Sequence, residues 1–302
     1  MSLRISCPVC NSRDTRIFHR KVWSYKKGRV YRCASCDLAF LYPAMTGKEE
    51  KRFYAHYDTH MKKRLSFSPP GGIGKSHVSA RAAAAERFAV VKGLFKGART
   101  ALEIGSSTGA FLETLKNAGF SRGGLTGIEP CRAHREYSRR VTSDVYGDIS
   151  ELPAGRKFDI ICMFHVFEHI ARPALFLREC KRHLKNKGRM LIEVPFIQDP
   201  LISLYDSSVF KDFYFQPMHP YVHSLGSLRH IFLRSGFRET KAIYYQRYGL
   251  DNHLAWLSKG KPGGDRNFAR LFAGDRFYKD ALEKTGTTDT LFYAAEYFKE
   301  KD

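Results

Sequence analysis

Leu102-Glu103-Ile104-Gly105-Ser106-Ser107-Thr108-Gly109-Ala110-Phe111 is the stretch of sequence that decides the fold. Its apolar start predicts a short buried strand, and the apolar residues from Phe111 onward begin a helical stripe. Gly105 and Gly109 allow the backbone to turn tightly and to approach a bound ligand closely. Because a helix N-terminus after such a turn presents free backbone N–H groups, the stretch predicts a strand, turn and helix that bind a nucleotide.

An acidic residue follows the next predicted strand. Glu129 ends the apolar run 125–128 and lies 20 residues after Gly109. A carboxylate at this position can accept hydrogen bonds from the hydroxyl groups of a ribose. The alternative is an ordinary strand, loop and helix with a surface glutamate, but the spacing favours a nucleotide site.

Apolar runs continue along the chain and predict strands at 125–128, 145–146, 158–164, 190–194, 241–246 and 288–297. Helices are predicted at 79–96, 130–140, 173–187 and 227–234. Strands that alternate with helices in this way are typical of a doubly wound parallel α/β sheet. We expect a seven-stranded, Rossmann-like sheet in which the last strand lies between the fifth and the sixth. Ligands bind at the carboxyl ends of such strands, where the sequence places Glu103, Glu129, Asp148 and His165.

Two pairs of cysteines with equal gaps lie near the N-terminus. They are Cys7/Cys10 and Cys33/Cys36, with 22 residues between the pairs. Four thiolates can close a tetrahedral zinc site that leaves no open position, which predicts a structural ion. The segment between the pairs alternates in polarity and predicts a β-hairpin with a turn at Lys27-Gly28. We therefore expect a zinc ribbon, although its spacer is slightly longer than usual.

The chain divides by composition into three parts. The zinc ribbon is expected over 1–45, a linker over 46–78 and the main α/β domain over 79–302. A short helix is predicted within 49–60, and the Ser-, Pro- and Gly-rich stretch 66–74 is predicted to be a flexible loop, either a linker or a lid. Aromatic-rich 196–225 and the stretch 249–286 are expected to be insertions that shape a substrate site.

The formal net charge is +21 over 302 residues, and residues 1–64 hold 15 Lys or Arg against 5 Asp or Glu. Such a surface attracts nucleic acid, an anionic membrane or a phosphorylated small substrate, or it serves only solubility. The sequence has no apolar run long enough for a membrane helix and no recognisable secretion signal. Together with the paired cysteines, this predicts a cytoplasmic protein.

Five separated motifs, taken together, identify a family resemblance. Leu102–Gly109, Gly127–Pro130, Gly147–Ile149, Phe158–Ile161 and Val166–His169 resemble the corresponding motifs of class I S-adenosylmethionine-dependent methyltransferases. The resemblance covers roughly residues 80–247 and 288–298. The ribbon, with Tyr31-Arg32 and Phe40–Pro43, is similar to the zinc-binding module of sugar C-methyltransferases. The stretches 246–254 and 259–264 resemble methyltransferases from bacterial surface-polysaccharide gene clusters.

The resemblance implies S-adenosylmethionine as the cofactor and S-adenosylhomocysteine as the product. Glu103 and the turn formed by Gly105, Ser106, Ser107 and Gly109 would hold the methionine part. Glu129 would bind the ribose hydroxyls, and Asp148 and Ile149 would meet the adenine. Pro130, Phe164 and His165 complete the candidate cofactor contacts. Ser107 stands where the family commonly has glycine, and its small side chain should preserve binding.

Methyl transfer from a sulfonium is an in-line displacement, so the protein mainly positions the groups and removes a proton from the acceptor. His165 is the first candidate for the base. His169, His219 and His223 are the other histidine candidates, and Glu168 could orient a histidine. A hydrogen-bonded structural role is the alternative for each of them.

Several other functions compete with this interpretation. His165-x-x-Glu168-His169 matches the H-x-x-E-H pattern of one metalloprotease class, which gives no reason for the nucleotide-type strands. An RNA methyltransferase would use the basic surface, whereas a cofactor-binding scaffold would bind without turnover. A nicotinamide dehydrogenase lacks its Gly-x-Gly-x-x-Gly motif here. The expected acceptor is a small molecule, a nucleotide-linked sugar or polysaccharide precursor, methylated on carbon or oxygen.

Overall fold

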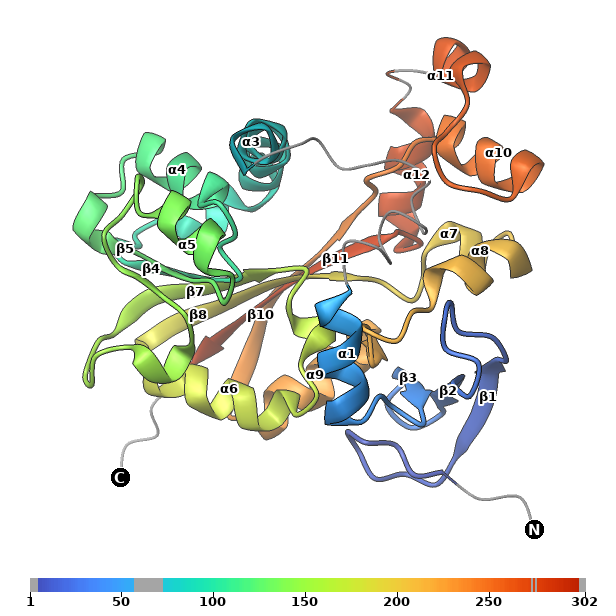
Figure 1. Ribbon diagram of the computed structural model, residues 1–302, viewed down its shortest axis with the longest axis horizontal. Helices are drawn as coiled ribbons and strands as arrows, with labels where there is room; N and C mark the ends of the chain where they lie inside the picture. The colour runs from blue at the N-terminus through green and yellow to red at the C-terminus, as the bar shows by residue number, and fades with distance from the viewer. Residues whose placement is uncertain (1–4, 57–72, 273, 275, 299–302) are drawn as a thin grey trace.

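The computed structural model describes residues 5–56, 73–272, 274 and 276–298 (Figure 1). Two sheets organise these residues. One has seven strands in the order β10-β11-β8-β7-β4-β5-β6, and the other has four in the order β1-β2-β3-β9. The predicted lid or linker stretch lies mostly within 57–72, outside the described residues.

Five strands of the large sheet run parallel: β4 (Ala101–Ile104), β5 (Leu125–Ile128), β6 (Val145–Tyr146), β7 (Phe158–Phe164) and β8 (Leu184–Pro195). The sheet ends in β10 (Phe237–Tyr245), with β11 (Thr290–Tyr297) inserted between β8 and β10. The predicted place of the last strand is therefore confirmed. β11 runs antiparallel to both neighbours, so the sheet is mixed rather than wholly parallel.

Helices cover both faces of this sheet (Figure 1). α3 (Ile73–Val91), α4 (Ala110–Asn117) and α5 (Arg132–Ser138) lie on one face, and α6 (Pro173–Arg182) and α9 (Leu225–Arg234) lie on the other. β7 supplies both cores, because Ile160 and Cys162 pack with α3 and α4 while Ile161 and Met163 pack with α6 and α9. A strand buried on both faces explains the continuous apolar run that predicted it.

Several predicted boundaries are wrong. The strands predicted at 190–194 and 241–246 begin earlier, at Leu184 and Phe237, and the helix predicted at 79–96 is α3, which spans Ile73–Val91. The helix at 173–187 ends at Arg182, and Lys187-Gly188 lies inside β8. The register between β7 and β8 jumps from Phe158↔Leu184 to Ile160↔Arg189, so extra residues bulge from β8, with Lys187 at a φ of 61°. The helix at 130–140 begins only at Arg132, after Cys131. Short 3-10 helices complete this region: η1 (Lys92–Phe95), η2 (Arg122–Gly124), η3 (Ile149–Glu151) and η4 (Phe167–His169).

The predicted N-terminal hairpin is present. β1 (Thr15–His19), β2 (Arg29–Cys33) and β3 (Ala39–Tyr42) form an antiparallel sheet, followed by α1 (Gly47–Ala55). The turn requires Gly28, because a Cβ there would lie 2.5 Å from the Tyr25 ring. A fourth strand, β9 (Tyr221–Val222), pairs with β3 although it belongs to the aromatic-rich stretch 196–225. The ribbon and that stretch therefore share one sheet.

The two stretches expected to be insertions are mainly helical. The first holds α7 (Pro200–Ser203) and α8 (Ser208–Tyr214), and the second holds α10 (Leu250–Lys259), α11 (Arg266–Phe272) and α12 (Phe277–Thr285). Both sets project from the same end of the large sheet (Figure 1). Among the described residues, no helix is long and apolar enough to cross a membrane.

Candidate functional site

The turn after β4 has the backbone shape that close ligand approach requires. Gly105, Ser107 and Gly109 have φ values of 78°, 46° and 81°. A Cβ on Gly105 would lie 2.5 Å from Val166 Cγ2, so only glycine fits there. Ser107 adopts a left-handed conformation, which residues other than glycine seldom adopt.

Glu129 holds this turn from the end of β5. The Ser107 N–H donates to Glu129 Oε2 at 2.9 Å, and the Cys131 N–H donates to Oε1 at 2.8 Å. The residue is only 9% exposed. Glu129, the predicted ribose ligand, thus also fixes the shape of this turn (residues 105–109), which we call the cofactor turn after its predicted role.

Glu103 is a buried carboxyl with unused acceptor capacity. Its Oε2 is buried and has no hydrogen-bond partner among the described residues. Burial raises the pKa of Glu103 to about 8, with a further rise from Glu129 and an opposing effect of the Arg87 charge. Such a group gains from a cationic ligand, and the ammonium of a bound methionine moiety is one.

The remaining cofactor candidates surround the same turn. Asp148 caps η3, where its Oδ1 accepts from the Ser150 N–H at 2.9 Å; this bond lowers the pKa of Asp148. The Phe164 ring packs 4.4 Å from the Phe111 ring. Ser106 and Ile149 are buried, whereas Pro130 is exposed. These residues lie at the ends of β4 to β7, as predicted.

His77 of α3 was missed by sequence reasoning. Its Nδ1 lies 3.0 Å from Thr108 Oγ1 and its Nε2 lies 3.2 Å from Glu113 Oε2. α3 therefore packs against the cofactor turn. The predicted helix began only at 79, so no signal connected His77 to the turn.

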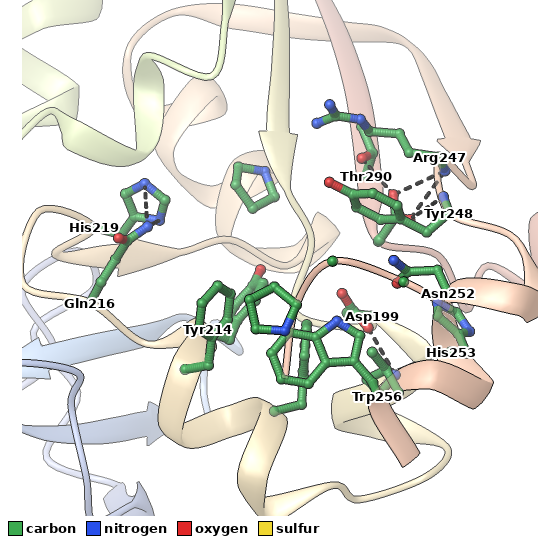
Figure 2. Close-up of a pocket in the computed structure, with 18 of the residues that line it drawn as sticks. Asp199, Tyr214, Gln216, His219, Arg247, Tyr248, Asn252, His253, Trp256 and Thr290 are labelled. Carbon is green, nitrogen blue, oxygen red and sulfur yellow. Dashed lines mark hydrogen bonds between the residues drawn. The ribbon is translucent and has the colours of Figure 1, made fainter. Parts of the chain in front are cut away.

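A cavity of about 590 Å³ lies beside the carboxyl ends of β7 and β8. Figure 2 shows Gln216 and His219 on one side, Arg247, Tyr248, Asn252 and His253 on the other, and Tyr214 with Trp256 between them. Residues of both stretches therefore contribute to its walls. The cavity also contacts His165, Pro195, Asp199, Leu201, Phe210, Phe213, Pro262, Gly263, Gly264, Asp289 and Thr290.

One wall of the cavity is aromatic. The Trp256 ring lies 4.9 Å from the rings of both Phe210 and Phe213, measured between centroids. This cluster joins α8 to α10 and presents a broad apolar surface. Flat aromatic surfaces of this kind pack well against the apolar face of a ring-shaped ligand.

Two buried carboxyl groups, Asp199 and Asp289, also line the cavity. Burial raises the pKa of both Asp199 and Asp289. The nearby Asp289 raises the pKa of Asp199 further, whereas hydrogen bonds from Thr290 and from backbone N–H groups oppose the rise at Asp289. Asp289 accepts from the N–H of Tyr248 at 3.1 Å and from Gln246 Nε2 at 2.8 Å. The part of the cavity that these two groups line is polar, which suits hydroxyl groups.

His165 lies on the cavity wall and contacts two carboxylates. Its Nε2 lies 3.1 Å from Glu193 Oε1 and 2.8 Å from Arg247 Nη1, and its Nδ1 lies 3.4 Å from Glu168 Oε1. Burial by itself lowers the pKa of His165, but the two carboxylates outweigh it and raise that pKa to about 9. The side chain is 29% exposed, so it is accessible from the cavity.

Glu193 and Arg247 were missed as site residues. Glu193 also forms an ion pair with Arg87, whose guanidinium lies over the Phe164 ring. Glu193 sits near the carboxyl end of β8, so the rule that selected Glu103 and Glu129 would also have selected it. Arg247 reaches His165 across 82 residues of sequence, and no local pattern predicts that contact.

The other catalytic candidates differ in their access to the cavity. His219 lines it, whereas Glu168, His169 and His223 do not. His223 is fully buried, and burial lowers its pKa to about 3. His169 lies beside His219, with 4.6 Å between ring centroids.

The four predicted metal-binding cysteines converge. Their Sγ atoms all lie within 4.8 Å of one another, with 3.6 Å between Cys7 and Cys36 and 3.5 Å between Cys10 and Cys33. A tetrahedral zinc ion with Zn–S bonds of about 2.3 Å places its sulfurs about 3.8 Å apart. Both pairs also form the same knuckle, since the Asn11 N–H donates to the Cys7 carbonyl and the Asp37 N–H to the Cys33 carbonyl, each at 3.0 Å. The cluster therefore fits zinc.

Comparison with known proteins shows which family the chain belongs to. Residues 75–242, more than half of the chain, match the family described as "Methyltransferase domain". A ubiquinone biosynthesis O-methyltransferase of Chelativorans sp. (strain BNC1) is 36% identical over 104 residues, which are 32% of this chain and 40% of that protein. The chain thus spans less than half the length of this curated relative.

Among solved structures, an S-adenosylmethionine-dependent methyltransferase from Archaeoglobus fulgidus has a TM-score of 0.50 at 22% identity, covering 72% of this chain and 94% of the other. A similar match is a methyltransferase from Thermotoga maritima described as a possible histamine N-methyltransferase. It has a TM-score of 0.47 at 20% identity and covers 82% and 94% of the two chains. The Archaeoglobus likeness shows the fold alone.

Proposed function

Because the chain belongs to the methyltransferase-domain family, we propose that it transfers the methyl group of S-adenosylmethionine to a small acceptor in the cavity beside His165. The position of the cavity carries this proposal. Val166, next to His165, packs against Gly105 of the cofactor turn, so the turn and the cavity wall are adjacent. A cofactor at the turn would have its reactive end close to an acceptor in the cavity.

The residues at the turn fit the cofactor. The Glu103 oxygen that has no hydrogen-bond partner among the described residues would meet the methionine ammonium. Because Gly105 has no side chain, the cofactor could approach the backbone there. Glu129 would bind the ribose hydroxyls, and Asp148 with Ile149 would meet the adenine. The bound cofactor supplies an already activated methyl group on its sulfonium.

Proton removal from the acceptor is the step assigned to the protein. With a pKa of about 9, His165 acts as a base only in its neutral form, the minor form near pH 7. In that form it takes a proton from an acceptor hydroxyl, or from a carbon next to a keto group, and the deprotonated atom receives the methyl group. The thioether product is S-adenosylhomocysteine. His165 and His219 are the two histidine candidates on the cavity wall, and His165 is preferred because it ends β7 beside the turn.

A nucleotide-linked sugar or another polysaccharide precursor is the proposed acceptor class. The wall formed by Trp256 and its aromatic neighbours suits the apolar face of a sugar ring, and Asp199 and Asn252 offer hydrogen bonds to hydroxyl groups. The net charge of +21 favours an acceptor with phosphate groups. The resemblance of the ribbon to that of sugar C-methyltransferases points in the same direction.

The ribbon is proposed to hold one structural zinc ion through Cys7, Cys10, Cys33 and Cys36. The division into a ribbon at 1–45, a linker at 46–78 and a methyltransferase domain at 79–302 is proposed with it. An RNA acceptor is the second candidate, favoured by the excess of 10 positive charges within residues 1–64.

Methyl-labelled S-adenosylmethionine and a bacterial extract test the acceptor class. The extract is incubated with the protein and then separated into small-molecule, nucleic-acid and protein fractions. We expect nuclease-resistant label in the small-molecule fraction, and much less label with the Glu129→Ala variant at a limiting cofactor concentration. Nuclease-sensitive label would overturn the small-molecule proposal in favour of RNA, and no label despite cofactor binding would support a scaffold.

A further inference from the structure

We propose that Glu168, His169 and His219 bind a divalent transition-metal ion at the edge of the acceptor cavity. Their three ligand atoms lie within 4.8 Å of one another. A tetrahedral zinc ion with bonds of about 2.0–2.1 Å places its ligand atoms about 3.4 Å apart. Shifts of about 1 Å at the ends of the side chains therefore close the site around an ion.

Glu168 supplies the strongest reason to place a cation here. Its side chain is 1% exposed, and neither carboxylate oxygen has a hydrogen-bond partner among the described residues. The nearest recorded ionic partner is His165 Nδ1, 3.4 Å from Oε1. A buried carboxylate without hydrogen bonds is costly unless a cation compensates its charge.

The hydrogen bond of His169 prepares it as a ligand. His169 Nδ1 lies 2.8 Å from the Met218 carbonyl oxygen, which accepts only from a protonated Nδ1. The neutral ring then has its lone pair on Nε2. A backbone carbonyl that fixes the tautomer in this way is a common partner of metal-binding histidines.

His219 arrives from a distant part of the chain. It lies between α8 and β9, and its ring meets that of His169 at an angle of 80° with 4.6 Å between centroids. Gln216 Nε2 lies 3.3 Å from either ring nitrogen of His219. Glu168 and His169 belong to η4, so the site joins η4 to the loop that leads into β9.

A second Glu- and His-containing cluster provides a useful contrast. Glu129, Cys131 and His134 also lie within 4.8 Å of one another. Both Glu129 oxygens already accept backbone N–H groups, from Ser107 and Cys131. Both oxygens of that carboxylate therefore accept hydrogen bonds, whereas neither oxygen of Glu168 has a hydrogen-bond partner among the described residues.

The ligand set predicts a reactive site rather than a structural one. Two histidines and one carboxylate leave coordination positions open, as in catalytic zinc sites and non-haem iron sites. His219 and His165 both line the acceptor cavity, so the open positions face it. The ion would bind an acceptor oxygen and stabilise the negative charge that forms when the acceptor loses its proton. This role rests on the proposed function, whereas the existence of the site does not.

Cobalt(II) titration of the purified, zinc-loaded full chain tests the site. Zinc occupies the cysteine cluster first, so added cobalt reports a second site. We expect one equivalent to bind, with d–d absorption but no thiolate-to-cobalt charge-transfer band. Glu168→Gln and His219→Ala should each weaken cobalt binding by at least about 10-fold. His230→Gln, a half-buried histidine outside the cluster, should leave it unchanged.

Folding is checked by the thermal unfolding midpoint and by S-adenosylhomocysteine affinity. If Glu168→Gln does not fold, His219→Ala decides, because His219 lies on a cavity wall. Absence of cobalt absorption in the wild type, equal binding by His219→Ala, or a thiolate band would overturn the proposal. Cobalt binding is read without an acceptor, so a failure of the methyl-transfer proposal gives a different result from a failure of the metal site.

Discussion

Glu129 combines two roles in one carboxylate, because it holds the cofactor turn and is the proposed ribose ligand. Glu129→Ala removes both backbone contacts and the ribose contact. We expect S-adenosylhomocysteine to bind about 10- to 100-fold more weakly, since hydrogen bonds to a charged group contribute about 1.5–3 kcal/mol each. Isothermal titration calorimetry measures the change, with Glu136→Ala on the exposed surface as the matched control. Unchanged affinity would mean that the ribose assignment is wrong.

Glu103 should make cofactor affinity depend on pH. Its pKa is about 8 in the folded protein, so it is largely neutral at pH 7 and must lose a proton to pair with an ammonium. Affinity for S-adenosylhomocysteine should therefore rise roughly 10- to 30-fold from pH 6.5 to 8.5 and then level off. In Glu103→Gln, binding should be weaker and the Glu103-dependent rise should disappear. A wild-type affinity that does not change over this range would contradict the assignment.

The raised pKa of Glu103 also makes the free energy of unfolding depend on pH. This dependence has the opposite sign to that of a salt-bridged carboxylate, whose pKa is lowered by folding. The unfolded chain loses the Glu103 proton near pH 4.3, whereas the folded chain keeps it until about pH 8. The contribution of Glu103 to stability therefore decreases as the pH rises through this window. Denaturant unfolding of Glu103→Gln and wild type between pH 5 and pH 8 should converge at the acidic end.

His165 is the residue on which the proposed chemistry depends. In His165→Gln we expect a loss of turnover of about 100-fold or more, because a positioned base contributes about 10²–10⁴-fold. The affinity for S-adenosylhomocysteine should remain unchanged, as His165 lies on the acceptor side of the turn. Rates of label transfer at saturating cofactor provide the measurement, with His183→Gln as the control. Normal turnover in His165→Gln would transfer the role to His219.

At the scale of elements, the turn between β4 and α4 depends on one steric contact. Gly105→Ala adds a Cβ that would lie 2.5 Å from Val166, at a φ of 78°. Gly97→Ala is the matched control, since Gly97 has a φ of 77° but no atom within 4 Å of the added Cβ. We expect both variants to lose about 1 kcal/mol of stability from backbone strain. Only Gly105→Ala should lose cofactor binding, and equal binding in both would contradict the role of this contact.

Elements also show where sequence periodicity was reliable. β5 and β7 match their predicted bounds because each is a mainly apolar run buried within the sheet. Lys187-Gly188 was interpreted as a helix end, although it forms a bulge in β8. Glycine next to a lysine is compatible with both structures, and only the register with β7 distinguishes them.

At the scale of the whole molecule, the ribbon supports one wall of the acceptor cavity. Phe40 pairs with Tyr221, the Leu41 N–H donates to the Pro220 carbonyl, and the Trp23 N–H donates to the Phe215 carbonyl. These contacts enclose the loop that carries Gln216 and His219. The proposed zinc ribbon is therefore expected to shape the acceptor site from outside the large sheet.

Loss of the ribbon metal should then affect the acceptor more than the cofactor. In Cys33→Ser we expect a rise of about 10-fold or more in the acceptor concentration needed for half-maximal label transfer. Cofactor affinity should stay within about twofold, because the described backbone contacts between the ribbon and the large domain involve β9 and the loop before it rather than the cofactor turn. Cys131→Ser, an exposed cysteine outside the cluster, is the control. Equal loss of acceptor and cofactor binding would indicate general unfolding instead.

The sequence by itself determined the order of the strands of the large sheet, the glycine turn after β4 and the four-cysteine cluster. Each of these depends on residues that are close in sequence or on repeated short spacings, so local sterics and hydrophobic periodicity specify them. Only the tertiary structure decided that β11 runs antiparallel, that β9 joins the ribbon, and that Arg247 and Glu193 surround His165. The same is true of the approach of His219 to Glu168 and His169. These contacts join distant segments, and their partners are selected by how packed layers fit together, which no local pattern records.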